Sequence, residues 1–152
     1  MLADLCSYRN AQSVGAWFGP GDTGNDPGVK FHLSVAEGNV FTGHGVGYVR
    51  LGVVEYRENL IVTPEQIATG WAPGGFDALT DEDFAAVATL EPEVVILGTG
   101  RALRFPHPRL TRALTDAHIG LEVMDTAAAC RTFNILAAEG RKVAAAILID
   151  RA

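Results

Sequence analysis

The second half of the chain alternates short apolar runs with segments of helical character. Val94–Leu97 and Val143–Ile149 are apolar at every position, and Ile119–Met124 is a third, mostly apolar run. Runs without polar alternation are typical of strands that are covered on both faces. Because a segment long enough for a helix separates each run from the next, the pattern predicts parallel strands joined by right-handed crossovers.

Helix-start signals lie ahead of the first apolar run and between the first two. Residues 80–83 (Thr-Asp-Glu-Asp) are similar to a capping box, with Asp83 where Glu or Gln is usual, and predict a helix over 80–90. Pro108 suits the first position of a helix, and the residues after it predict one over 109–117. Both helices would cover a face of the sheet.

A last helix is predicted between the second and third apolar runs. Asp125 or Thr126 is expected to cap it, and Gly140 is expected to end it just after Glu139. Its first residues include Ala127–Ala129, and small side chains allow a helix to approach its neighbour closely. We therefore expect this helix to pack tightly on the sheet.

The part of the chain before residue 63 has a β pattern. Apolar and aromatic runs at 46–51, 53–56 and 59–62 predict strands, and Gly52 between the first two predicts a tight turn. Strands joined by so short a connection pair antiparallel. The predicted fold class is therefore α/β, with an antiparallel β portion ahead of a parallel βαβαβ half.

The N-terminal residues differ from the rest of the chain. Residues 19–28 are a run of turn-forming residues without periodicity. We expect residues 1–28 to be a flexible or mis-assigned N-terminal extension. Residues 30–150 are expected to form a single domain, which suits a chain of 152 residues.

Composition argues against several classes of function. The net charge of −6 argues against a nucleic-acid partner, which requires a basic surface. No apolar run approaches the ~20 residues of a transmembrane helix, and the first residues show no secretory signal pattern. Cys6 and Cys130 make no disulfide framework, so a reducing, cytoplasmic setting is expected. The scattered histidines predict no metal site.

Polar residues follow two of the predicted strands, at the edge where open α/β sheets bind ligands. Free N–H groups in the first helical turn favour an anion there, and nearby arginines would add charge-assisted bonds. The predicted pocket for a phosphate or carboxylate comprises Gly98, Thr99, Arg101, Arg104, Asp125, Thr126, Arg131 and Asn134. A purely structural interpretation stays open, in which Asp125 caps the helix and Arg131 pairs with Glu122 or Asp125. In that interpretation Asn134 bonds a neighbouring loop.

No catalytic residue and no cofactor are predicted. Cys130 lies one turn into the last helix, where a thiolate would be favoured, but neither His107 nor His118 forms a recognisable Cys/His arrangement with it. A buried, unreactive thiol is the preferred interpretation. The Gly-Thr-Gly at 98–100 is not followed by the Lys and Ser/Thr of a phosphate-binding loop, and Leu103 replaces the last glycine of a dinucleotide fingerprint.

Three motifs in this half of the chain carry a family resemblance. They are Leu-Gly-Thr-Gly at 97–100, Glu-Val-Met-Asp-Thr-Ala-Ala-Ala-Cys-Arg-Thr-Phe-Asn at 122–134, and Glu-Gly-Arg at 139–141. Together they resemble the Mth938-like domain family, once described as a domain of unknown function, and the resemblance extends over residues 30–149. It implies a three-layer α/β fold with a mixed central sheet and no established enzymatic reaction. Mitochondrial members of that family are assembly factors of respiratory complex I.

The resemblance implies a non-enzymatic assembly or adaptor protein. Its partners would be respiratory complex subunits or assembly factors, and it would be peripheral to the membrane through them. Such a protein needs a contact surface, and Trp71 and Phe76, in a Gly/Pro loop, are the predicted exposed anchors. The alternative is a small-molecule enzyme or sensor that binds an anionic ligand at the strand ends. A homo-oligomer that pairs through exposed sheet edges is a third interpretation.

Overall fold

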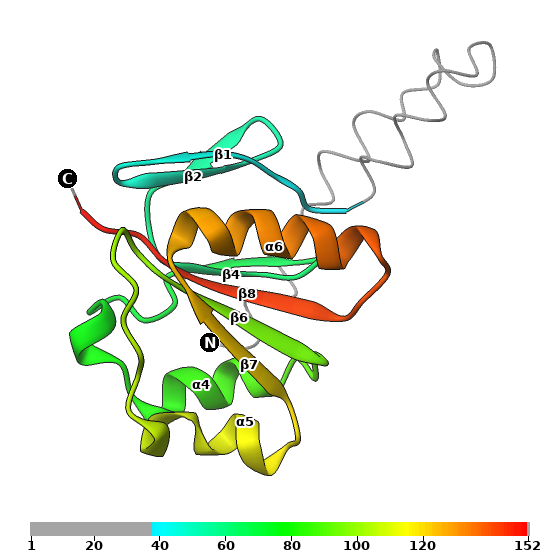
Figure 1. Cartoon of the computed structure of the whole chain (residues 1–152). Helices are drawn as coiled ribbons and strands as arrows, with labels where there is room; N and C mark the ends of the chain where they lie inside the picture. The colour runs from blue at the N-terminus through cyan, green and yellow to red at the C-terminus, as the bar shows by residue number, and fades with distance from the viewer. Residues whose placement is uncertain (1–37, 152) are drawn as a thin grey trace.

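The computed structural model describes residues 38–151, which form two β-sheets with a long helix between them (Figure 1). This helix, α6 (Thr126–Ala138), covers one face of the larger sheet, and shorter helices cover the other face. The larger sheet with helices on both faces makes the three layers that were expected. The predicted N-terminal extension at residues 1–28 lies outside the described residues.

The larger sheet is mixed. Its strands are β4 (Leu60–Val62), β5 (Ile67–Thr69), β6 (Val94–Thr99), β7 (Gly120–Met124) and β8 (Val143–Leu148). They lie in the order β5-β4-β8-β6-β7. Strand β6 pairs in parallel with β7 and β8, whereas β4 pairs antiparallel with β5 and β8. The predicted parallel half is confirmed, and every residue of its central strand β6 is buried.

The helices below the sheet follow their local start signals. Helix α4 (Asp81–Ala88) begins with the predicted capping box, in which the Thr80 hydroxyl accepts the Asp83 N–H at 3.3 Å and Asp83 Oδ2 accepts the Thr80 N–H at 2.9 Å. A 3-10 helix, η2 (Phe76–Ala78), precedes it. The capping bonds satisfy N–H groups that the first helical turn leaves without partners.

The single helix predicted over 109–117 is divided into two pieces. The first is a 3-10 helix, η3 (Pro108–Thr111), with Pro108 at its start as expected, and the second is α5 (Arg112–Asp116). Thr111, with φ −99° and ψ 14°, departs from helical geometry between them. The start signal was therefore read correctly, whereas the continuity of the helix was wrong.

The smaller sheet lies across the outer side of α6 (Figure 1). It consists of β1 (Phe41–Gly45), β2 (Tyr48–Leu51) and β3 (Val54–Tyr56), antiparallel and in that order. The turn predicted at Gly52 is confirmed by its φ of +61°, which glycine adopts without strain. Asn134 of α6 holds this sheet in place, because its Oδ1 accepts the Phe41 N–H at 2.9 Å and its Nδ2 donates to the Phe41 carbonyl at 2.8 Å.

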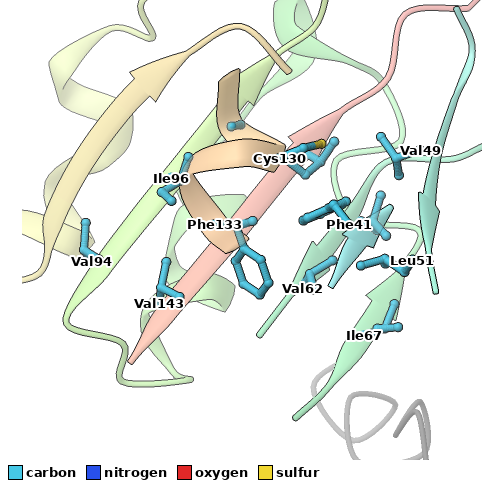
Figure 2. Close-up of a cluster of buried hydrophobic side chains, with 14 residues drawn as sticks. Phe41, Val49, Leu51, Val62, Ile67, Val94, Ile96, Cys130, Phe133 and Val143 are labelled. Carbon is cyan, nitrogen blue, oxygen red and sulfur yellow. The ribbon is translucent and has the colours of Figure 1, made fainter. Parts of the chain in front are cut away.

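Apolar side chains of α6 fill the space between the two sheets (Figure 2). The rings of Phe41 and Phe133 pack edge to face, with centroids 5.4 Å apart. Cys130 and Ile96 are buried in the same cluster. A second cluster, between the larger sheet and α4 and α5, contains Phe84. Both faces of the larger sheet are thus buried, which explains the uninterrupted apolar runs of β6 and β8.

The prediction that Trp71 and Phe76 are exposed anchors is wrong. Only 2% of Trp71 is exposed, because the loop folds back onto α4. There the indole N–H donates to the Asp83 carbonyl at 2.9 Å and the ring packs against Phe84. Phe76 is partly buried under the guanidinium of Arg104, whose Cζ lies 4.4 Å from the ring centroid.

Candidate functional site

A pocket of about 310 Å³ lies at the carboxyl ends of β6 and β8. We call it the strand-end pocket. Residues 44–48 around the β1–β2 turn line it on one side, and residues 125–127 at the start of α6 line it on another. The turn at 100–101 and the segment 148–150 complete the lining. Four segments that are far apart in the sequence therefore meet at the edge where α/β sheets commonly bind ligands.

Thr126 ties these segments together. Its hydroxyl accepts the Gly100 N–H at 2.9 Å and donates to the Leu148 carbonyl at 2.9 Å. Its own N–H donates to the Gly100 carbonyl at 2.9 Å. One threonine thus joins the end of β6, the end of β8 and the start of α6, so the base of the pocket is held by internal hydrogen bonds.

Two carboxylates occupy the positions where backbone N–H groups would favour an anion. Asp125 caps α6, and its Oδ1 accepts the Ala128 N–H at 2.8 Å. Asp150 Oδ2 accepts the Arg101 N–H at 2.7 Å. Gly100 has a φ of +89°, and a Cβ at that position would collide with the Asp150 carboxylate. The protein therefore supplies its own negative charges at this edge.

Three of the predicted site residues, Arg101, Asp125 and Thr126, line the strand-end pocket. Arg131 is exposed, one helical turn after Ala127, which also lines the pocket, so the two share a face of α6. Within residues 38–151, Arg131 makes no ion pair with Glu122 or Asp125. Arg131 is not among the residues that line the pocket, and within the described residues it makes no salt bridge.

Gly98 and Thr99 do not line the pocket, because both are buried beneath it. A Cβ on Gly98 would lie 3.0 Å from the Ala129 Cβ and 3.1 Å from Ile147 Cδ1, so this glycine allows α6 to approach β6 closely. The Thr99 hydroxyl donates to the Ala102 carbonyl at 2.7 Å and accepts the Arg104 N–H at 3.2 Å. These contacts shape the loop after β6.

Arg104 and Asn134 are also placed elsewhere. The Arg104 guanidinium stacks on Phe76, and both polar groups of the Asn134 side chain bond the backbone of Phe41. Asn134 therefore has the structural role that the sequence left open, and its partner lies in β1. Of the eight predicted site residues, only Arg101, Asp125 and Thr126 line the strand-end pocket.

Sequence reasoning missed Asp150 and the β1–β2 turn as parts of this site. Asp150 follows an apolar strand as its first polar residue, which is the same signal that pointed to Arg101 and Asp125. The turn at 44–48 carried no such signal, because it reaches the pocket only through the packing of β1 on α6.

Cys130 is buried, as expected. Burial raises the pKa of its thiol to about 12, against a smaller lowering effect of the Arg131 charge. A thiol with such a pKa carries almost no thiolate at neutral pH and is a poor nucleophile. In the part of the chain that the structure describes, no group of three or more His, Cys, Asp or Glu side chains could hold a metal ion.

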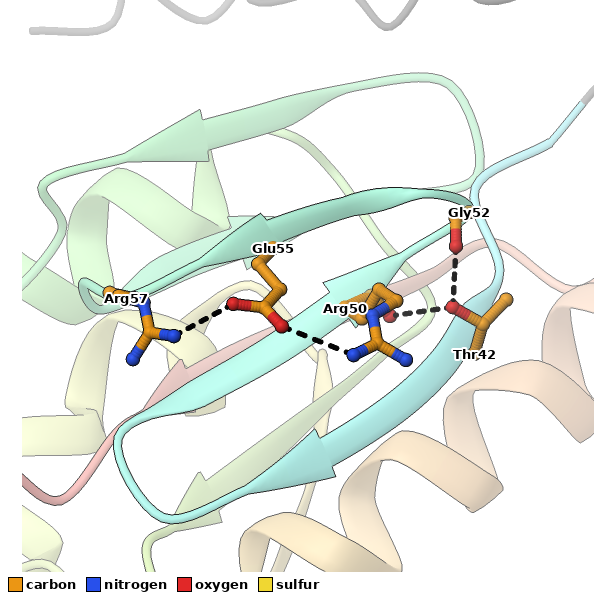
Figure 3. A network of polar contacts seen from close by, with 5 residues as sticks. All are labelled: Thr42, Arg50, Gly52, Glu55 and Arg57. Carbon is orange, nitrogen blue, oxygen red and sulfur yellow. Dashed lines mark hydrogen bonds and ion pairs between the residues drawn. The ribbon is translucent and has the colours of Figure 1, made fainter.

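A separate polar network lies on the outer face of the smaller sheet (Figure 3). Glu55 accepts hydrogen bonds from Arg50 at 3.1 Å and from Arg57 at 2.8 Å. The Arg50 hydrogen bond is the main cause that holds the pKa of Glu55 below its ordinary value. The Thr42 hydroxyl donates to the Gly52 carbonyl at 2.6 Å. These groups are solvent-exposed and link the three strands.

The chain is similar to several known proteins and solved structures. Residues 41–148 match the family model described as "Protein of unknown function (DUF498/DUF598)". The chain belongs to this family. A solution structure from Bordetella pertussis, described as a Mth938-like domain, has a TM-score of 0.66 and 31% identity, and the match covers 74% of this chain and 87% of that one. A crystal structure from Bordetella parapertussis has a TM-score of 0.70 and 37% identity, with 74% and 97% covered. The Mth938-like fold is therefore confirmed.

Several similar proteins from animals share a name that describes a role in assembly. The mouse "NADH dehydrogenase [ubiquinone] 1 alpha subcomplex assembly factor 3" is 39% identical over 85 residues, which are 55% of this chain and 46% of the mouse protein. The chain thus spans about half the length of this relative. None of the helices that the structure describes is long and apolar enough to cross a membrane.

Proposed function

We propose that this protein is a non-enzymatic assembly or adaptor factor for the respiratory NADH dehydrogenase, complex I, and that it contacts subunits or other assembly factors of that complex. The observation that carries the proposal is the 39% identity to the mouse assembly factor. The family model matches residues 41–148, which are nearly all of the folded part that the structure describes, so the proposal concerns this domain.

The chemistry of the described residues supports binding rather than turnover. Asp125 and Asp150 each accept a backbone N–H, and Thr126 uses its hydroxyl for two internal bonds. The Cys130 thiol is buried with a pKa of about 12. Nucleophilic catalysis needs a free, activated nucleophile, and neither the Thr126 hydroxyl nor the Cys130 thiol provides one.

A contact surface has its best anchor in the loop after β6. Phe105 is 70% exposed and Leu103 is 52% exposed, so two large apolar side chains of one loop face the solvent. Aromatic side chains often dominate the binding energy of protein interfaces. We propose that Phe105 takes the anchoring role that the sequence had suggested for Trp71.

The test is affinity capture from gently solubilised native cells, read by quantitative mass spectrometry. The wild-type protein is expected to enrich NADH dehydrogenase subunits or their assembly factors, and Phe105→Ser is expected to reduce that enrichment. Val53→Ser is the matched control, because Val53 is 93% exposed on the β2–β3 turn. Absence of these subunits from the wild-type capture would refute the assembly proposal, and equal loss with both variants would refute the role of Phe105.

A second candidate function is the binding of a small anionic ligand at the strand-end pocket. The observation that favours it is the pocket itself, with the exposed Arg101 in its lining. A ligand present at ~100 times its dissociation constant would stabilise the fold by about 2.7 kcal/mol. A thermal-shift screen of carboxylated and phosphorylated metabolites tests this, and a screen without any stabilising compound speaks against it.

A further inference from the structure

The strand-end pocket holds an internal carboxylate in a cradle of backbone. Asp150 lies in the segment after β8, and its Oδ2 accepts the Arg101 N–H at 2.7 Å. Gly100 has a φ of +89° and leaves the space that the carboxylate fills, since a Cβ there would collide with both oxygens. We call the Arg101 N–H and the space beside Gly100 the cradle; together they hold one carboxylate group.

We propose that this cradle is a carboxylate-binding site which Asp150 occupies as an internal ligand, and that a carboxylate-bearing ligand opens the site by displacing Asp150. This proposal rests on the second proposed function, because it names the ligand class and the regulation of the same pocket. It is independent of the assembly proposal.

The contact of Asp150 is suited to displacement. Its hydrogen bond with Arg101 is solvent-exposed, so water can replace either partner during exchange. The chain just before it is held separately, because the Ile149 N–H donates to Asn59 Oδ1 at 2.7 Å. The Asp150 side chain can therefore leave the cradle while the end of β8 stays anchored.

The charges around the pocket favour a carboxylate once Asp150 has left. Arg101 is exposed, lines the pocket and makes no ion pair within residues 38–151. Asp125 is held apart from this site, because it remains bound to the Ala128 N–H. Displacement turns the Asp150 carboxylate away from the Arg101 N–H, and the incoming carboxylate takes its place beside the Arg101 side chain.

The surroundings leave room for a ligand larger than a single carboxylate. A second pocket, of about 450 Å³, adjoins the strand-end pocket of about 310 Å³. Val46, Gly47, Ile149 and Asp150 line both. Movement of the Asp150 side chain would therefore widen the passage between them, so that the body of a ligand could extend beneath the β1–β2 turn.

The experiment is an NMR titration of the folded, full-length protein with sodium acetate at constant ionic strength, followed through the amide resonances of Gly100 and Arg101. In Asp150→Ala these resonances are expected to shift saturably, with an apparent dissociation constant at least about tenfold lower than in the wild type, because the competing internal group is gone. Asp116→Ala makes the same change in net charge at an exposed position on α5 and is expected to behave like the wild type.

Several outcomes would overturn the proposal. They are an absence of saturable shifts in Asp150→Ala, equal affinities in Asp150→Ala and the wild type, or an equal gain in Asp116→Ala. Inorganic phosphate that binds Asp150→Ala as tightly as acetate would overturn the carboxylate assignment. If Asp150→Ala does not fold, Asp150→Asn keeps an acceptor for the Arg101 N–H without the charge, and its affinity for acetate is expected to exceed that of the wild type. A negative titration leaves the capture result for the assembly proposal unaffected, so the two failures are distinguishable.

Discussion

Asn134 allows the contact between α6 and the smaller sheet to be tested quantitatively. Asn134→Leu keeps a side chain of similar size but removes both bonds to Phe41, at 2.9 Å and 2.8 Å. The N–H and the carbonyl of Phe41 then lack partners in a partly buried position. Each such group costs about 1–3 kcal/mol, and partial access to water lowers this, so we expect the free energy of unfolding to fall by about 2–4 kcal/mol.

Urea denaturation followed by circular dichroism measures this loss, and hydrogen exchange of the Phe41 amide localises it. Asn134→Asp keeps the acceptor for the Phe41 N–H and removes the donor, so its loss should be smaller than that of Asn134→Leu. Arg131→Leu, an exposed change in the same helix, should alter stability by no more than about 0.5 kcal/mol. A loss below about 0.5 kcal/mol in Asn134→Leu, or unchanged exchange at Phe41, would refute the stabilising role of the two hydrogen bonds between Asn134 and Phe41.

Packing, ionisation and ion pairing provide three further tests. Gly98→Ala should lower the free energy of unfolding by about 1–3 kcal/mol in urea melts, because the new Cβ would lie 3.0 Å from the buried Ala129 Cβ. The free energy of unfolding should fall as the pH rises above 9.0, the ordinary pKa of a thiol. Above that pH the Cys130 thiol of the unfolded chain loses its proton, whereas the buried thiol of the folded chain, with a pKa of about 12, retains it. Urea melts of Cys130→Ala should lack this part of the loss. Arg50→Ala should raise the pKa of Glu55, measured by carbon-13 NMR titration, since the Arg50 hydrogen bond is its main lowering cause.

Short sequence motifs correctly predicted the helix starts and the turn that depend only on residues next to each other in the chain. The capping box at 80–83, the cap at Asp125 and the turn at Gly52 all have the predicted geometry. The burial of Trp71 could not be read in this way, because it depends on a loop that folds back to the carbonyl of Asp83. Gly/Pro content predicts a loop correctly but does not say which side chains of the loop turn inward.

The candidate site was predicted as an edge of the sheet and not as a set of contacts. The polar residues that follow β6 and β7 indicated Arg101 and Asp125, and both line the strand-end pocket. Arg104 also follows β6, but its side chain packs on Phe76. Neither the periodicity nor the spacing of the sequence predicts the direction of that side chain. Asp150 reaches Arg101 across 49 residues of sequence, so only the strand order makes them neighbours.

The motif at 122–134 serves mainly to build the fold. Asp125 caps α6, Thr126 joins two strand ends, and Ala129 permits close packing over β6. Asn134 fixes the smaller sheet, and Phe133 fills the core between the sheets. A motif of this kind identifies the family through its architecture, and it says little about chemistry.

Function must then be sought in side chains that the fold does not use. Arg101, Arg131 and Phe105 are exposed, and the fold would stand without their side chains. In the functions proposed above, Phe105 would contact a protein partner, and Arg101, which lines the strand-end pocket, would contact a ligand. Variants at these positions should therefore change partner or ligand binding at nearly constant stability, and this separation distinguishes a functional residue from one that maintains the structure.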